Sequence, residues 1–249
     1  MAAGEARHVH EKTGKKVCIV DRGNRAQWID LWNGIDYILP RYEHGAVRIV
    51  NTSGVRPYIL AKLATRWKWK PYKPKPAEVK FTLDELRFAE PFRGLVMIEP
   101  NVKAIGHSNK AWIWRRWEQL VDAMPDTQFV QCSPGNGGQL FGTKLAITPT
   151  FRHAIAVLSV CRAFVGTEGG LMHGAAAVGT PAVILWSEFI SPNITGYEMH
   201  RNIRHAGEAC GSRLDCSGCR KSMAAITVDE VVDNLKEILH ERHSHEAGR

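Results

Sequence analysis

The sequence predicts an α/β protein made of two Rossmann-like halves, each with a parallel sheet. Short apolar segments typical of buried strands alternate with segments of helical periodicity along most of the 249 residues, and this alternation favours parallel sheets covered on both faces. It occurs in two runs, so we expect an N-terminal domain over residues 1–91 and a C-terminal domain over residues 92–249. Two such halves leave a cleft between them, where ligands usually bind.

The composition is that of a globular protein, with 44% hydrophobic and 23% charged residues. No apolar run reaches the roughly 18 residues of a transmembrane helix, and the N-terminal segment lacks the apolar core of a secretory signal. We therefore expect a cytoplasmic protein whose six cysteines are thiols or metal ligands. The net charge of +8 favours an anionic partner such as a nucleotide, a nucleic acid or an anionic glycolipid.

The N-terminal half is short, and its elements are predicted from apolar runs. They are, in order, a strand at 16–20, a helix at 26–32, strands at 36–39 and 46–50, and a short helix at 57–65.

A basic segment at residues 66–80 follows, and its prolines exclude a regular element, so we expect a loop. It holds one arginine, five lysines, two tryptophans and a tyrosine. Interleaved cations and aromatic rings fit a single nucleic-acid strand, an anionic glycolipid, or a solvated linker with snorkelling lysines. Lys68 and Lys70 are its candidate acceptor-side residues.

The C-terminal half begins after a capping-box pattern at residues 82–85, which predicts a helix to about residue 90. The elements expected after it are strands at 94–98, 128–131, 163–165 and 182–185, and helices at 112–124, 151–161 and 171–178. A glycine-rich loop at 134–138 lies among them, and a second capping-box pattern at 227–230 begins the last helix.

Residues 167–173, TEGGLMH, lie where a predicted strand ends and a helix begins. Ligands of parallel sheets bind at this edge, and a helix N-terminus attracts anions. Glu168 can accept hydrogen bonds from a ribose or sugar hydroxyl, Gly169 and Gly170 let a diphosphate approach the backbone, and His173 can donate to phosphate. The alternative is a tight turn whose glycines only permit close packing.

Residues 166–186 resemble the donor-site signature of glycosyltransferase family 9, the ADP-heptose:lipopolysaccharide heptosyltransferases and their relatives. The matching positions are Glu168, Gly170, His173, Ala175 and Pro181. Gly169 stands where the family usually has a hydroxyl residue, which leaves the identity of the sugar nucleotide open.

Two further stretches carry the same resemblance. Lys110 and Trp112 are similar to the family's lysine-x-tryptophan motif, in which the lysine contacts the donor phosphate. Asn101, in the loop before them, is a further candidate donor-binding residue. The third stretch holds three cysteines and the helix that follows them, as in many relatives.

The resemblance implies a GT-B fold with a reduced N-terminal half, an inverting mechanism, and no catalytic metal. The N-terminal half would present the acceptor and a carboxylate base. The family's glycine-aspartate motif after the first strand is absent, so Asp21, at the end of that strand, and Asp30, on the next helix, are the candidates. Asp21 can equally cap a helix or pair with Arg22 or Arg25, and Arg22 is a candidate acceptor-side residue.

The three cysteines, Cys210, Cys216 and Cys219, could instead bind a structural zinc ion, with His200 or His205 as fourth ligand. The alternative is a set of free thiols. The loop at 190–200, with Tyr197 and His200, either closes over the donor or lies at the surface.

The sequence therefore predicts a glycosyltransferase that needs no cofactor besides its nucleotide-sugar donor, ADP-heptose-like by resemblance. A saccharide or glycolipid is the expected acceptor. One alternative is transfer to nucleic acid, for example a hydroxymethylated base in phage-type DNA modification. The other is a non-catalytic nucleotide-sugar or nucleic-acid-binding module.

Overall fold

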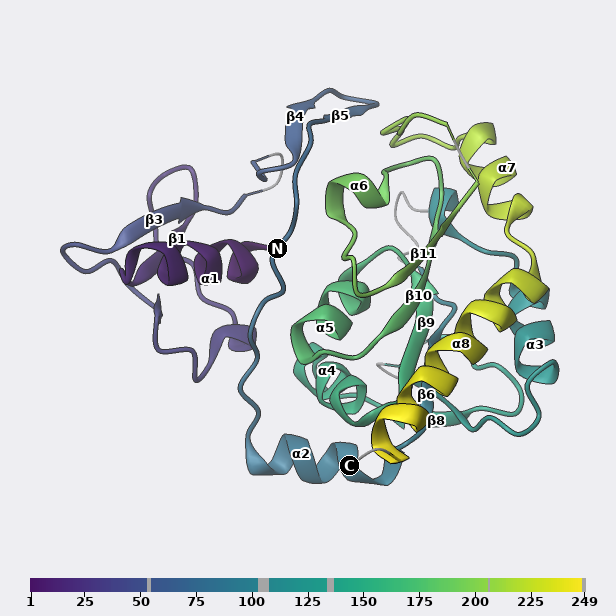
Figure 1. The fold of residues 1–249 in the computed structure, drawn as a ribbon. Helices are drawn as coiled ribbons and strands as arrows, with labels where there is room; N and C mark the ends of the chain where they lie inside the picture. The colour runs from purple at the N-terminus through teal and green to yellow at the C-terminus, as the bar shows by residue number, and fades with distance from the viewer. Residues whose placement is uncertain (53–54, 103–107, 134–136, 206, 248–249) are drawn as a thin grey trace.

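A computed structural model describes residues 1–52, 55–102, 108–133, 137–205 and 207–247 (Figure 1). The elements of the N-terminal part, up to the capped helix α2, are α1 (Ala2–Thr13), β1 (Val17–Val20), η1 (Asp30–Trp32), β2 (Ile38–Leu39), β3 (Val47–Val50), β4 (Ile59–Lys62), β5 (Trp67–Trp69) and α2 (Leu83–Ala89). The elements after it are η2 (Glu90–Phe92), β6 (Val96–Glu99), η3 (Ser108–Lys110), α3 (Trp114–Asp122), β7 (Phe129–Ser133), β8 (Lys144–Ile147), α4 (Phe151–Val160), β9 (Ala163–Thr167), α5 (Gly170–Val178), β10 (Ala182–Trp186), α6 (Pro192–Thr195), β11 (Arg201–Arg204), α7 (Ser217–Ala225) and α8 (Val228–Ala247).

The larger sheet is six-stranded and parallel, with the order β11-β10-β9-β6-β7-β8. Counted from β6, this is the 3-2-1-4-5-6 order of a doubly wound Rossmann sheet, seen from the other edge. The direction of winding reverses between β6 and β9, whose last paired residues are Glu99 and Gly166. The crevice at this reversal is where doubly wound sheets bind their ligands.

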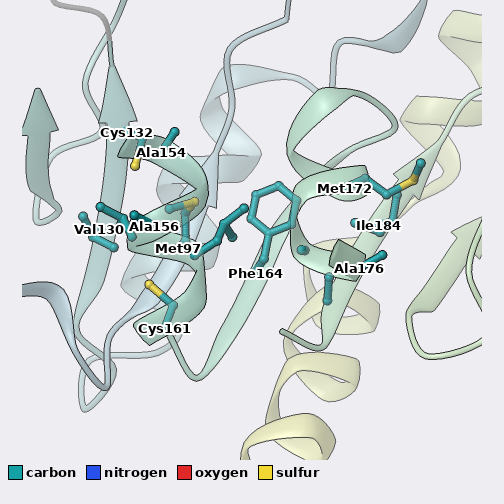
Figure 2. Close-up of a cluster of buried hydrophobic side chains, with 14 of the residues drawn as sticks. Met97, Val130, Cys132, Ala154, Ala156, Cys161, Phe164, Met172, Ala176 and Ile184 are labelled. Atoms are coloured by element: carbon teal, nitrogen blue, oxygen red, sulfur yellow. The ribbon is translucent and has the colours of Figure 1, made fainter. Parts of the chain in front are cut away.

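Two apolar layers cover this sheet, because alternate side chains of each strand point to opposite faces. On one face, Met97 of β6 and Phe164 of β9 pack against Ala154 of α4 and Met172 of α5 (Figure 2). On the other, Trp117 of α3 and Leu235 of α8 are fully buried in a second cluster. Each such large side chain contributes roughly 1.5–3 kcal/mol by leaving water, so this half has an extensive core.

The N-terminal sheet is smaller, with the parallel order β2-β1-β3. Helix α1, for which the sequence analysis had no expectation, packs on it through Ala3 and Ala6, because small side chains let a mostly polar helix approach closely. The helix ends at Gly14, which has a left-handed φ of 68° that favours glycine. In Figure 1 this sheet and α1 lie beside the large sheet, connected to it through β4, β5 and α2.

A buried arginine joins the two parts. Arg152 of α4 forms an ion pair with Glu85 of α2, and both side chains are less than a tenth exposed. The same guanidinium donates to the backbone oxygens of Asp30 and Lys80. Glu85 also completes the capping box predicted with Thr82. The arginine therefore satisfies carbonyls from the N-terminal part while anchoring α2.

Three local predictions for the N-terminal half are wrong. Residues 57–65 form no helix, because β4 pairs with β5 in an antiparallel hairpin. Residues 67–69 form the second strand of this hairpin and not a loop. Trp67 and Trp69 lie on the same side of the strand, and Trp69 packs against Phe189 of the C-terminal domain. The helix expected at 26–32 is reduced to the single turn η1.

The C-terminal predictions are confirmed for each strand and helix named there, with shifts of a few residues. Strands β8 and β11 and helices α6 and α7 had no counterpart in the predictions, and the glycine-rich loop lies partly outside the described residues. No helix in the described ranges is long and apolar enough to cross a membrane.

Candidate functional site

The site begins at the carboxyl ends of β6 and β9. Lys110 lies in the connection after β6, and Glu168 follows β9, so the two flank the point where the sheet's winding reverses. Their side chains form an ion pair although they are 58 positions apart in the sequence. The fold thus brings two motif residues together at the edge where parallel sheets bind ligands.

This ion pair is largely sheltered from solvent, with Lys110 15% and Glu168 13% exposed. The ammonium also lies 4.9 Å from the centre of the Phe189 ring, a cation–π contact. The two motif residues thus engage each other, and the phosphate-binding role of Lys110 and the hydroxyl-binding role of Glu168 stay predictions.

The two glycines of the TEGGLMH stretch have different surroundings. Gly169 precedes α5, and a methyl group there would meet only the Thr167 oxygen at 3.9 Å, which is ordinary contact. A methyl group on Gly170 would meet the Phe151 ring at 3.2 Å. Gly169 therefore leaves the helix N-terminus approachable for an anion, whereas Gly170 fits the packing interpretation.

His173 lies one turn into α5 and is held by a tyrosine. Its Nδ1 is 2.9 Å from the hydroxyl oxygen of Tyr197. Burial, with the nearby positive charge of Lys110, holds the pKa of His173 well below its usual range, so the ring is neutral. A neutral imidazole has one N–H, so Nε2 can donate to a phosphate only if Nδ1 accepts its hydrogen bond from the Tyr197 hydroxyl.

Tyr197 and His200 are both 5% exposed, so neither lies in a surface loop. His200 stacks edge-on with Tyr197, and its Nε2 is 3.3 Å from the Met172 oxygen. Burial lowers the pKa of His200 to about 4, and burial also raises the pKa of Tyr197. The three rings form one neutral packed group behind α5.

Glu99 is a site carboxyl that the sequence analysis did not single out. It ends β6 opposite Gly166, and its Oε1 accepts a hydrogen bond of 2.7 Å from the Asn101 backbone. Burial raises the pKa of Glu99 to about 7. The Asn101 side chain donates to the Gly138 oxygen at 3.2 Å, so it connects the loops after β6 and β7.

The candidate bases and Arg22 lie in the N-terminal part. Asp21 closes a tight turn after β1, its Oδ1 accepting a 2.9 Å hydrogen bond from the Arg25 backbone. Asp30 is exposed on η1, and Arg22 is exposed in the turn. Asp21 thus caps a turn and not a helix, and it meets Arg25 through the arginine's backbone N–H; its part in catalysis stays a prediction.

The start of the basic segment, β5, is the second strand of the β4–β5 hairpin, which contacts the C-terminal domain, and residues 70–80 form no regular element. Trp69 donates through Nε1 to the Phe189 oxygen at 3.0 Å, and its ring packs edge-on against the Phe189 ring. Both tryptophans are half-buried, while Lys68 and Lys70 are exposed. Because its indoles are engaged in packing, the hairpin offers lysines but few free rings for stacking on bases.

A groove of about 670 Å³ lies beside Tyr197, between residues 72–76 and residues 192–202. Tyr72 and Asn193 are among its lining, and an exposed ion pair between Lys73 and Glu198 joins its two walls. Its volume is within the range of small-molecule sites. It shares Tyr197 with the His173 side of the site.

The three clustered cysteines have their sulfurs within 4.8 Å of one another. The Sγ of Cys210 is 3.9 Å from that of Cys216 and 3.5 Å from that of Cys219. Neither predicted fourth ligand joins them: His200 packs behind α5, and the Nε2 of His205 pairs with Glu230 at 2.7 Å.

Several residues at this site escaped the sequence analysis. Phe189 contacts the Lys110 ammonium, Asn109 immediately precedes Lys110 in the chain, and Tyr197 contacts His173. Tyr197 was expected either to close over the donor or to lie at the surface, and its contact with His173 was not expected. The one available signal was position: Asn109 precedes the motif lysine, and Glu99 ends a predicted buried strand.

A doubly wound domain with a cation, an acid and a histidine around a helix N-terminus at its winding reversal has the arrangement that is typical of nucleotide-binding α/β domains. The family model of glycosyltransferase family 9 (heptosyltransferase) matches residues 58–225. The chain belongs to this family.

Solved structures agree on the fold. The Escherichia coli ADP-heptose lps heptosyltransferase II is 20% identical, with a TM-score of 0.53 over 70% of this chain and 56% of its own. The family 9 glycosyl transferase from Veillonella parvula DSM 2008 is 16% identical, with a TM-score of 0.51 over 68% and 55%. This chain thus spans little more than half the length of these proteins. A search of curated protein sequences found no match.

Proposed function

We propose that this protein transfers a sugar from a nucleoside-diphosphate sugar to a hydroxyl acceptor, with inversion and without a catalytic metal. Membership of glycosyltransferase family 9 supports the donor class. An ADP-heptose-like donor and a saccharide or glycolipid acceptor follow from the resemblance of the donor signature and from the name of the similar E. coli enzyme.

The observation that carries the proposal is the ion pair of Lys110 with Glu168 beside the open N-terminus of α5. A diphosphate leaving group develops negative charge as its bond to the sugar breaks. Lys110 and the unpaired backbone N–H groups after Gly169 supply fixed positive charge where that bond breaks. These groups can stabilise the negative charge of the leaving diphosphate, as a metal ion does in other transferases.

In the proposed reaction, the acceptor hydroxyl oxygen forms a bond to the anomeric carbon while the bond from that carbon to the diphosphate oxygen breaks. The hydroxyl proton passes to a carboxylate, and the nucleoside diphosphate leaves with the bonding electron pair. Asp21 and Asp30 are the proposed bases. The groove beside Tyr197 and the exposed Lys68 and Lys70 are the surfaces we propose for a polar or anionic saccharide acceptor.

A thermal-shift screen with ADP, UDP, GDP, CDP and dTDP tests the donor site. A nucleotide at about 100 times its dissociation constant should stabilise the protein by roughly 2.7 kcal/mol. We expect one nucleotide to give a clear shift that does not depend on added magnesium or manganese and that Lys110→Ala abolishes. Lys68→Ala, on the exposed hairpin, is the matched control and should keep the shift. A screen without any shift contradicts the donor site.

Turnover assays then test the bases. With the chosen donor series and saccharide acceptors, Asp21→Asn or Asp30→Asn should lower kcat by about 10²–10⁴ if that residue accepts the proton, with the nucleotide shift unchanged. Two variants of full activity would refute both assignments and leave the donor site standing.

A further inference from the structure

We propose that Cys210, Cys216 and Cys219 bind one thiophilic metal ion, zinc or a chemically similar divalent ion, and that this ion fixes the loop that positions Lys110. The ion is distinct from the reacting centre and acts through Asn109. The part that concerns Lys110 rests on the proposed donor site, whereas the metal site itself does not.

The geometry of the sulfurs fits a tetrahedral ion. Two thiolates bound to one zinc at about 2.3 Å and at the tetrahedral angle are about 3.8 Å apart. The two sulfur separations from Cys210, 3.5 and 3.9 Å, lie on either side of this value. A disulfide requires about 2.05 Å, and the three residues are free cysteines. The cluster is thus spaced as metal ligands are.

The chemistry of the donor set also favours such an ion. Three thiolates select soft or borderline metals such as zinc or iron over magnesium or calcium. Among the described residues, no other group of three metal-ligating side chains comes together. Within the part of the chain that the structure describes, no fourth side chain joins the cluster, so three ligands of the tetrahedron are assigned.

The loop that carries two of these cysteines holds Asn109 through its whole amide group. The Asn109 Nδ2 donates to the backbone oxygens of Ser212 at 3.2 Å and Leu214 at 2.7 Å. Its Oδ1 accepts a 2.9 Å hydrogen bond from the Cys216 backbone. Asn109 is 3% exposed, so these bonds are made away from water and depend on the shape of the loop.

Lys110 is the next residue in the chain, and both belong to η3. A shift of residues 212–216 would therefore move Asn109 and, with it, the backbone from which Lys110 extends to Glu168. Since a misplaced charge interacts more weakly with a bound phosphate, loop order and donor affinity are coupled.

The same loop holds the hairpin in place. Trp67 donates from its backbone to the Gly211 oxygen at 2.8 Å, and Arg213 donates to the Thr65 oxygen at 2.9 Å. Gly211 has a left-handed φ of 63°, and a methyl group there would meet the Trp67 oxygen at 1.9 Å. One ion would thus fasten three segments of chain: the loop, η3 and the β4–β5 hairpin.

Metal content of the purified full chain tests the site directly. After expression and purification without chelator, elemental analysis should find about one zinc or iron ion per chain. Cys216→Ser and Cys210→Ser should each lose it, and Cys18→Ala, a buried cysteine of β1 far from the cluster in the sequence, should retain it. A wild-type chain that holds no metal, even after reconstitution with zinc, or that shows a disulfide among these cysteines by mass spectrometry, overturns the proposal.

Calorimetric titration with ADP tests the coupling to Lys110. Chelation of the wild-type ion should weaken ADP binding by about tenfold, the size expected when a hydrogen bond to a buried group is lost. Asn109→Ala should do the same in the metal-loaded protein, and chelation should add little in that variant because both act through one contact. Asn109→Asp, which keeps the acceptor for Cys216, serves if the alanine variant does not fold.

The outcomes separate the two proposals. Equal losses on chelation in wild type and in a folded Asn109 variant would disprove the path through Asn109. If the metal-loaded wild type binds no nucleotide, the proposed function fails, while the metal content still decides the cysteine site.

Discussion

The two sheets of this molecule present their polar groups in opposite ways. In the six-stranded sheet, Lys110 pairs with Glu168, and His173 pairs with Tyr197, around the carboxyl edge where doubly wound sheets generally bind ligands. In the three-stranded sheet, the Asp21 carboxylate accepts from its own turn and Asp30 is exposed. The polar groups of the proposed donor side are thus held by one another, whereas the candidate bases of the proposed acceptor side are held by their own turn or lie in solvent.

The physical reason lies in the size of the two cores. Residues around Lys110 and Glu168 are supported by two apolar clusters, one on each face of the large sheet. The smaller sheet has fewer strands and one main cluster, so its loops are supported mainly by their own backbone hydrogen bonds. Preorganised charge requires a well-supported scaffold, and the larger sheet has the more extensive one among the described residues.

The largest expected effect comes from removing the buried ion pair of Arg152 with Glu85, which joins the two parts. Arg152→Ala leaves Glu85 buried without its cation and frees two backbone oxygens, so we expect a loss of about 3–5 kcal/mol of unfolding free energy. Denaturant titration measures it. Arg93→Ala, whose partner Glu90 is exposed, should change the free energy of unfolding far less. Equal losses in the two variants would show that this buried ion pair stabilises the protein no more than an exposed one does.

The second prediction concerns the donor side alone. Lys110→Met keeps the length of the side chain but removes the ammonium from Glu168 and from the incoming phosphate. We expect ADP affinity to fall about 100-fold, or roughly 2.7 kcal/mol, with a folded protein by circular dichroism. Lys110→Arg should retain part of the affinity. An unchanged affinity in Lys110→Met would mean that this ion pair is structural only.

The third prediction is a pH dependence located at the end of β6. The pKa of Glu99 is raised from 4.5 to about 7, so the folded protein binds this proton more tightly than the unfolded chain does. Stability from this group is therefore complete below pH 4.5 and falls as pH rises towards 7. Glu99→Gln should raise the free energy of unfolding at pH 8 by about 2 kcal/mol and change it little at pH 4.

Denaturant titrations at the two pH values measure this difference. Glu43→Gln, an exposed residue of the smaller half, is the control and should be neutral at both. If Glu99→Gln has the same effect at pH 4 and pH 8, the buried-proton explanation is wrong.

The smallest expected effect is at the tyrosine behind His173. Tyr197→Phe removes one hydroxyl within 2.9 Å of Nδ1 and leaves a neutral, partly buried ring nitrogen without that partner. We expect a loss of about 1 kcal/mol of stability and a change in the tautomer of His173, which nitrogen-15 NMR detects. Tyr42→Phe, at an exposed ring, should leave both unchanged. If the tautomer of His173 is the same in Tyr197→Phe as in the wild type, a contact other than Tyr197 determines it.

Local sequence patterns determined much of the larger half. The capping box at Thr82 and the apolar runs of β6, β7, β9 and β10 each depend on neighbours a few positions apart, so they could be predicted. The motif residues Glu168 and Lys110 were also identifiable, from their place after predicted strands and from the family signature. Their pairing was not, because it depends on how two distant loops meet.

Tertiary structure decided three features: the β4–β5 hairpin, the ion pair of Arg152 with Glu85, and the partner that each polar side chain of the site contacts. Trp67 and Trp69 read as loop residues because prolines follow them, yet contact with Phe189 and with the backbone of Gly211 makes them a strand. Asn109 has no local pattern that marks it, and its role arises from backbone groups about 100 positions away. Short-range chemistry fixed the strands, helices and motifs, whereas the site was decided by long-range packing that no local stretch of sequence contains.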